Sequence, residues 1–245
     1  MAEVASVAMI APQSVERVVS SQEAERIGEL VWDDIECAAE WWEREKHRFL
    51  PEVGREFVRI VRPSAAVEAH PSDRDMMLAN MAMTEWFMFE RSFGAEGTPL
   101  EMYRDHCQDP DCAARLAQVI DTQFFSRFSI LDKDLESGMA VLQSLANGRR
   151  YDVYDPHVCE VPHWKDGVIA ERIAKVDGLW LIVGQMHLYD HAPADETGAD
   201  APGSVHPEDR DQAETLESAG SFLRLLRDCI GHNGRYRSTL KVFSA

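Results

Sequence analysis

The chain has 245 residues, of which 45% are apolar, and it contains 14 glycines and 11 prolines. A chain of this length and composition can bury a core as one large domain or two small ones, which excludes a disordered chain, collagen and a bare coiled coil. Its 43 acidic and 25 basic residues give a net charge of -18. Such a field repels phosphate backbones and anionic membranes, so binding to nucleic acid is not expected.

Cysteine usage and the apolar runs indicate a cellular location. The five cysteines are odd in number and scattered, unlike the paired cysteines of a secreted disulfide framework. The first thirteen residues carry Glu3 but no Lys or Arg, so they lack the positive region of a signal peptide. Uncharged apolar runs stay well short of the roughly twenty residues of a membrane span. The sequence therefore predicts a cytoplasmic protein without a membrane partner.

The N-terminal part has the signals of helices. Ser20 followed by Glu23 forms a capping-box pattern, and the apolar residues after it repeat at helical spacing as far as Pro51. A second short helix is predicted over 52–61, whose apolar residues share one face.

The segment 72–92 is predicted to be the central helix of this region. Ser72 is a typical N-cap, and the apolar residues that follow cover most of the helix circumference, as in a helix surrounded by other elements. Its five methionines favour core filling over an exposed partner groove. Glu85 and Glu90 are expected to be exposed or salt-bridged.

Two further helices follow. Thr98-Pro99-Leu100-Glu101 combines an N-cap, a first-turn proline and a capping glutamate, and Asp109-Pro110 repeats the device. Helical periodicity then continues to about Ser126. Residues 20–126 are therefore predicted to be entirely helical.

Beyond this point the apolar rhythm changes to that of strands. Asn147-Gly148 and Asp177-Gly178 suit tight turns with positive φ, and each lies between two β-rich runs. Five strands are expected, enough for a small antiparallel barrel; they cover 128–132, 138–145, 149–154, 167–176 and 179–189.

The last part differs in charge from the rest. Residues 190–211 have almost no large apolar side chain and are predicted to form an acidic linker. An amphipathic helix is expected from Leu216 to Ile230, closed by Gly231. The stretch 221–245 carries five basic residues against one acidic residue, so the tail is basic.

Motifs for enzymatic chemistry are weak. The chain lacks G-x-S-x-G, S-x-x-K, a P-loop and G-x-G-x-x-G, so no catalytic residue is assigned. His157, Cys159 and His163 form the best group of possible zinc ligands, but their spacing matches no known zinc pattern. His187 and His191 lie on one face of a strand about 13 Å apart. We therefore assign no metal ligand and expect no cofactor.

Four residues are candidates for binding a partner. Trp164 lies in the long connection between the two hairpins, and Tyr154 lies on the face of its strand opposite Tyr151 and is expected at the surface. Arg235 and Arg237 belong to the basic tail and are candidates for contact with acidic surfaces.

Residues 80–189 resemble a group of poorly characterised bacterial proteins in which a helical region precedes a small barrel, often linked to a SEC-C zinc motif. The resemblance is carried by segments 86–90, 97–101, 148–153 and 165–167, which read WFMFE, GTPLE, GRRYDV and KDG. It implies the helix-then-barrel order. The zinc motif itself begins with C-x-C, which this chain lacks, so the resemblance implies neither zinc nor an activity.

Together these patterns predict an α+β protein: a helical region over 1–126, a small antiparallel β-barrel over 127–189, the acidic linker 190–211, and a C-terminal helix with a basic tail over 212–245. The function they favour is a cytoplasmic accessory or regulatory protein that binds another protein and is not an enzyme. Two alternatives stay open: a metal-dependent hydrolase that uses the region of His157, Cys159 and His163, and an RNA-associated barrel that uses the basic tail. The sequence gives no oligomeric state.

Overall fold

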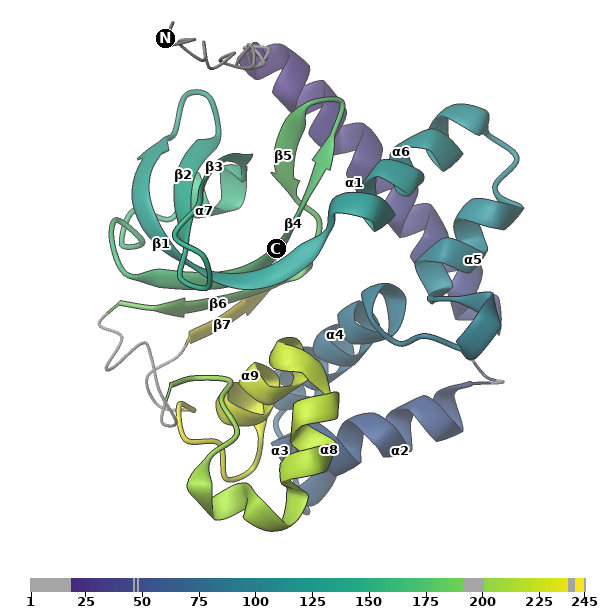
Figure 1. The fold of residues 1–245 in the computed structure, drawn as a ribbon, viewed down its shortest axis with the longest axis vertical. Coiled ribbons are helices and arrows are strands. Elements are labelled where there is room, and N and C mark those ends of the chain that lie inside the picture. Colours follow the sequence, from purple (N-terminus) through teal and green to yellow (C-terminus); the bar gives the residue numbers. More distant parts are fainter. Residues whose placement is uncertain (1–18, 46, 48, 192–200, 238–240, 245) are drawn as a thin grey trace, which may run out of the picture.

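The structure is a computed structural model that describes residues 19–45, 47, 49–191, 201–237 and 241–244. Within these residues, six helices precede a closed five-stranded barrel and two more follow it (Figure 1). The predicted α+β class and the order of its parts are confirmed. The helices are α1 (Ser21–Glu45), α2 (Leu50–Val61), α3 (Ser64–Val67), α4 (Asp73–Phe89), α5 (Pro99–His106), α6 (Pro110–Thr122), α7 (Pro156–Glu160) between two strands, α8 (Ala213–Ser218) and α9 (Gly220–Ile230), with short 3-10 helices η2 (Gly94–Glu96) and η3 (Pro207–Gln212).

The predicted helix starts are confirmed by their hydrogen bonds. The Ser20 hydroxyl accepts from the Glu23 N–H at 3.3 Å, and Thr98 and Glu101 form both bonds of a capping box at the start of α5. These bonds satisfy N–H groups that have no partner within the helix.

Helix α6 ends at Thr122, before the expected end near Ser126, because β1 begins at Phe124. Phe124 and Phe128 are four residues apart, which places them on one face of either a helix or a strand, so the pattern alone did not separate the two. Pairing decides for the strand: Phe124 lies opposite Ile173 on β4, and the Phe124 and Phe128 rings are 6.0 Å apart.

The strands are β1 (Phe124–Asp134), β2 (Met139–Ser144), β3 (Arg150–Tyr154), β4 (Val168–Val176), β5 (Leu179–Ile182), β6 (Met186–Asp190) and β7 (Lys241–Ser244). The barrel runs β1–β2–β3–β5–β4 and returns to β1. Every pairing in this ring is antiparallel except β3 with β5, which is parallel. Both predicted reversals are present, and at the second Asp177 and Gly178 have φ of 52° and 91°, the positive values such a turn requires.

The single strand expected over 179–189 is two strands. Strand β5 pairs with the second half of β4, whereas β6 pairs with the first half of β4 and with β7. The strand is interrupted around Gly184. There the N–H groups of Gln185 and Met186 donate to Glu85 on α4 instead of to a neighbouring strand. A Cβ at Gly184 would lie 2.8 Å from Glu85 Oε1, so glycine is needed for this approach.

The C-terminal part is more closely packed than its composition predicts. Residues 192–200 of the expected linker lie outside the described residues, but the Gly203 N–H donates to Asp228 Oδ2 on α9 at 2.8 Å, and His206 Nε2 lies 3.1 Å from the same carboxylate. The residues 241–244 of the expected basic tail form β7. The described helices include none with the length and apolar character needed to cross a membrane.

Burial divides between the barrel interior and a larger helical core. The barrel interior holds Phe128, Leu142, Tyr151 and Trp164 among others, while the second core lies between the helices and the outer face of β4. Helix α4 is buried from Trp86 to Phe89, as expected of a central helix, whereas its first turn is at the surface.

One buried arginine joins the two parts. The Arg172 Nε on β4 donates to Glu85 Oε1 at 3.1 Å, its Nη1 donates to Gln123 at 2.6 Å, and its Nη2 donates to Glu90. The guanidinium also lies within 6 Å of the centres of three phenylalanine rings, Phe89, Phe125 and Phe222. Both glutamates expected to be exposed or salt-bridged are thus paired, and Glu85 is fully buried.

Replacing Arg172 by Met should lower the free energy of unfolding by about 3–5 kcal/mol, because it leaves the buried Glu85 carboxylate without its ion partner. Urea denaturation followed by circular dichroism measures the change. The matched control is Arg150→Met, an exposed arginine on β3, for which a change within about 0.5 kcal/mol is expected. A loss for Arg172→Met as small as that of the control would contradict the role given to this pair.

Candidate functional site

Three ionisable side chains meet at one end of the barrel interior. They are Asp155, directly after β3, Glu171 in the middle of β4, and His187 in β6. All three side chains are fully buried. One ligand-type atom of each lies within 4.8 Å of the others, and among the described residues this is the group of His, Cys, Asp and Glu close enough to share an ion.

Local structure holds Asp155 and His187 in place. Asp155 is the N-cap of α7, and its Oδ1 accepts from the Val158 N–H at 3.0 Å. Its other oxygen, Oδ2, lies 3.3 Å from His187 Nε2, and Glu171 Oε2 lies 3.7 Å from the same nitrogen. The imidazole of His187 therefore stands between two carboxyl groups.

Burial and neighbouring charges shift the pKa values of the two carboxyl groups in opposite directions. Burial raises the pKa of Glu171 well above its ordinary value, and the neighbouring charge of Asp155 raises it further. Burial opposes ionisation of Asp155 as well, but His187 and the Val158 N–H outweigh it, so the pKa of Asp155 is lowered. The pKa values of the two carboxyl groups are thus shifted in opposite directions, an arrangement typical of functional sites.

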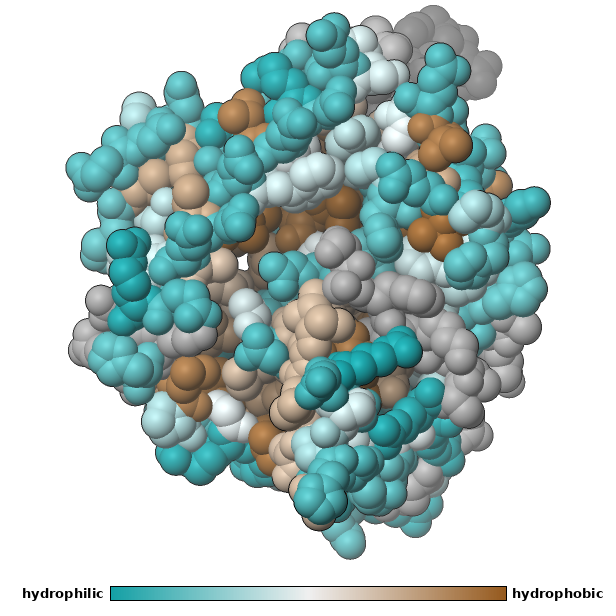
Figure 2. Space-filling model, turned by 180° about the vertical axis from the view of Figure 1, so that it is seen from behind, coloured by the Kyte–Doolittle hydropathy of each residue, from teal (hydrophilic) through white to brown (hydrophobic). Residues whose placement is uncertain are grey.

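A cleft of about 630 Å³ lies between α1 and the barrel, and Asp155 and His187 form part of its floor. One wall is a face of α1, and the opposite wall comes from α7 and the β5–β6 connection. In Figure 2 apolar residues lie at the bottom of a hollow on this side of the molecule, with hydrophilic residues around it. The apolar lining residues are Trp32, Ile35, Ala39, Ile182 and Val183.

Four glutamates line the cleft, three on α1 and one on α7: Glu36, Glu40, Glu43 and Glu160. All four are exposed, and the described residues that line the cleft include no lysine or arginine. The cleft therefore combines apolar walls with a negative rim.

Helix α1 is held against the barrel by one aromatic side chain. The Trp32 Nε1–H donates to the Ile182 carbonyl at 2.8 Å, and the Trp32 ring stacks on Tyr154 at 6.0 Å. Gly28 permits this packing, since a Cβ there would lie 2.8 Å from the Tyr154 ring. These contacts set the width of the cleft.

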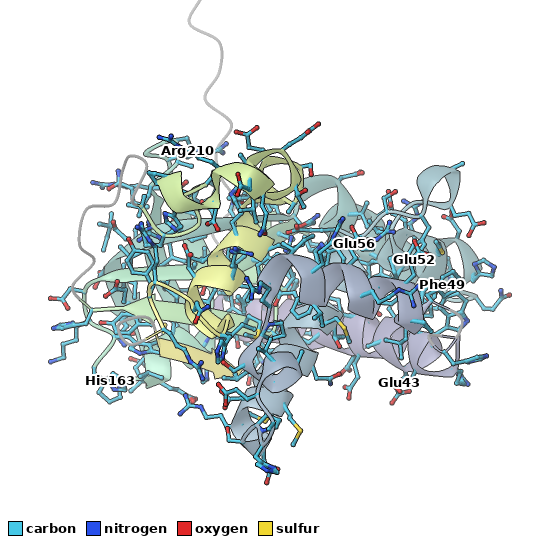
Figure 3. The ribbon with its side chains drawn as sticks, turned by 90° about the horizontal axis from the view of Figure 1, so that it is seen from below. Glu43, Phe49, Glu52, Glu56, His163 and Arg210 are labelled. Atoms are coloured by element: carbon cyan, nitrogen blue, oxygen red, sulfur yellow. The ribbon has the colours of Figure 1, made fainter. Side chains whose placement is uncertain are left out.

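The structure does not bring the predicted group of His157, Cys159 and His163 together around a common point. The His157 ring lies 4.9 Å from the His187 ring and lines the cleft. Cys159 is buried in the barrel core, where desolvation raises the pKa of its thiol to about 11. His163 is exposed, and Figure 3 shows it far from Glu43 of the cleft.

Trp164 and Tyr154, expected as surface binding residues, are both buried. Trp164 is fully buried and stacks on Tyr189 at 5.1 Å, so it covers the end of the barrel. Tyr154 is covered by Trp32 of α1. The alternation along β3 placed Tyr154 outside the barrel correctly, but a helix covers that outer face.

The two tail arginines are exposed and are not among the residues that line the cleft. Arg235 Nη1 lies 3.0 Å from His206 Nδ1, and Arg237 Nη1 donates to Ser64 and lies 3.5 Å from Glu68. Their charges are directed toward neighbouring groups of the same chain.

Comparisons with protein-family models, with curated proteins and with solved structures give no significant match. The resemblance to SEC-C-linked bacterial proteins therefore stays a prediction, and the site has to be interpreted from its own chemistry.

The sequence pattern pointed to His187 but to neither of its two partners, Asp155 and Glu171. Asp155-Pro156 repeats the N-cap signal of Asp109-Pro110, which marks Asp155 as the first residue of a short helix. Glu171 stands beside Arg172 within an otherwise apolar strand, VIAERIAKV. Two charges in a strand buried on both faces were the available signal.

The free energy of unfolding of Glu171→Gln, taken relative to that of wild type, should increase as the pH rises from about 5 to about 7. The increase should be at most about 1.4 kcal/mol per pH unit. Because the pKa of Glu171 is raised in the folded state, folding retains a proton that the unfolded chain releases above its ordinary pKa of 4.5. Wild-type stability therefore falls with rising pH through this group, and Gln removes the effect. Denaturant titrations at several pH values, with a metal chelator present, measure the difference.

The matched control is Glu136→Gln, which makes the same substitution at an exposed glutamate in the β1–β2 turn. A difference from wild type that is the same at every pH for Glu171→Gln would contradict the raised pKa of this carboxyl group.

Proposed function

We propose that the protein is a non-enzymatic accessory or regulatory protein that binds a basic, partly apolar peptide segment of another protein in the cleft between α1 and the barrel. The observation that carries this proposal is the combination of four rim glutamates with apolar walls in one cleft of about 630 Å³.

Charge supports a cationic ligand. The rim glutamates Glu36, Glu40 and Glu43 follow at helical spacing along one face of α1, so their carboxylates line one side of the cleft. A lysine or arginine side chain on a bound segment would meet the carboxylates of Glu36 and Glu40, and the net charge of -18 would speed its approach. An acidic ligand would be repelled by the same groups.

The walls support a ligand with an apolar side chain. Trp32 and Ile35 on α1 are only half-buried and present apolar surface to the cleft, and covering such surface is the main source of affinity in peptide recognition. A segment that carries both an apolar anchor and a flanking basic residue uses both features of the cleft.

A cytoplasmic location is part of the proposal. All five cysteines are unpaired in the structure, and three of them, Cys112, Cys159 and Cys229, are buried. Free buried thiols are typical of proteins that work in a reducing compartment. The hydrolase alternative based on His157, Cys159 and His163 is not retained, because that alternative needs these residues to converge.

Selection of random twelve-residue peptides on the purified chain tests the proposal. The selected peptides should be positively charged and carry at least one large apolar residue. Glu36→Gln/Glu40→Gln should weaken a selected, fluorescently labelled peptide about tenfold in anisotropy titrations, since it removes two rim charges. Added salt should weaken wild-type binding.

The matched control is Glu25→Gln/Glu29→Gln, which removes two exposed glutamates with the same spacing from the same helix, outside the cleft. Its affinity should stay within about twofold of wild type. Selection of acidic peptides, or equal losses in the two double variants, would refute the proposal.

A further inference from the structure

We propose that Asp155, Glu171 and His187 form a binding site for a divalent metal ion, preferentially Zn²⁺, at the floor of the cleft. One imidazole nitrogen and two carboxylate oxygens are ligand types that Zn²⁺ takes in proteins. The ion is distinct from the peptide of the proposed function, because the rim binds the peptide and the floor binds the ion.

The separations between the donor atoms fit this assignment. His187 Nε2 lies 3.3 Å from Asp155 Oδ2 and 3.7 Å from Glu171 Oε2. Ligand atoms at tetrahedral corners about 2.0–2.1 Å from a zinc ion are about 3.3–3.4 Å from one another. The two distances to the imidazole nitrogen are thus close to those that an ion between the three groups requires.

Unsatisfied polar atoms give independent support. Both carboxyl oxygens of Glu171 are fully buried without a hydrogen-bond partner. A buried polar group without a partner costs about 1–3 kcal/mol, and the other interior positions of this barrel are mostly apolar. A cation bound between the three side chains would give the Glu171 oxygens the partner that the protein itself does not supply.

The site provides three ligands and one open side. Asp155 and His187 both line the cleft, so a fourth position would face it and could take a water molecule or a donor group of a bound ligand. Three protein ligands with an open position are typical of zinc ions that bind or activate a ligand, whereas purely structural zinc ions have four. Rings of His157 and Trp164 pack beside His187 and shield the site from bulk solvent.

The test uses the full chain after removal of metal with a chelator. Zn²⁺ is titrated in competition with a chromophoric zinc indicator, and the retained zinc is measured after dialysis. Wild type should bind one Zn²⁺ per chain. Glu171→Gln and His187→Asn should each weaken this binding at least about 100-fold, while circular dichroism shows that the fold is retained.

Two controls separate the site from adventitious binding. Glu40→Gln removes a carboxylate from the rim of the same cleft, and His191→Asn removes an exposed histidine whose Nδ1 lies 3.3 Å from Asp166. Both should bind Zn²⁺ with wild-type affinity within about twofold. Asp155→Asn, which keeps an oxygen for the α7 cap, provides a third ligand variant if His187→Asn does not fold.

The proposal is overturned if wild type retains no more zinc than Glu171→Gln, or if His191→Asn removes the binding. Tighter binding of Mg²⁺ than of Zn²⁺ would overturn the choice of metal, since Mg²⁺ favours oxygen ligands alone. Neither result would affect the peptide-binding proposal, because that test compares variants of rim glutamates, none of which is a ligand of the proposed ion.

Discussion

The ion pair between Arg172 and Glu85 is the interaction on which the arrangement of the two parts depends. Arg172 leaves the outer face of β4 and enters the helical core, where only 1% of its side chain is exposed. Glu85 also accepts hydrogen bonds from the N–H groups of Gln185 and Met186 at the start of β6. A buried pair of this kind adds little net stability over an apolar pair, but it forms only when the barrel lies against α4 in the orientation that brings the two side chains together. The same contacts position the β5–β6 connection, which lines the cleft.

Strand β4 carries charges of opposite sign on opposite faces at consecutive positions. Glu171 points into the barrel and Arg172 points away from it, among the helices. A shift of pairing by one residue would place the guanidinium in the barrel interior and the carboxyl group against Glu85. The two charges therefore fix the register of the strand much more strongly than the apolar residues around them, which would tolerate either face.

The fold was largely predictable because its local signals are strong and agree with one another. Capping residues marked the helices, and Asn147-Gly148 and Asp177-Gly178 marked the hairpins. The parallel pairing of β3 with β5 was not predictable, because it joins segments that no short turn connects. The same limit applied to the candidate site. Its three residues come from three strands or strand ends, and nothing local in the sequence indicates that such positions meet.

The outward position of Tyr154 was predicted correctly, whereas its exposure was not. Strand alternation tells which side of a sheet a residue occupies, but the covering of that side by α1 depends on tertiary packing. Trp164 shows the same limit, since a tryptophan in a loop can either cover a core or face solvent.

Strand β7 protects the edge of the sheet. It pairs with β6 over residues 241–244, so the strand that carries His187 has backbone partners on both sides. Without these last residues, one side of β6 would present unpaired N–H and C=O groups, a surface on which a strand of another molecule can add. Shortened versions of the chain would thus be prone to self-association. They would also lack the backbone hydrogen bonds that hold one side of the strand carrying His187.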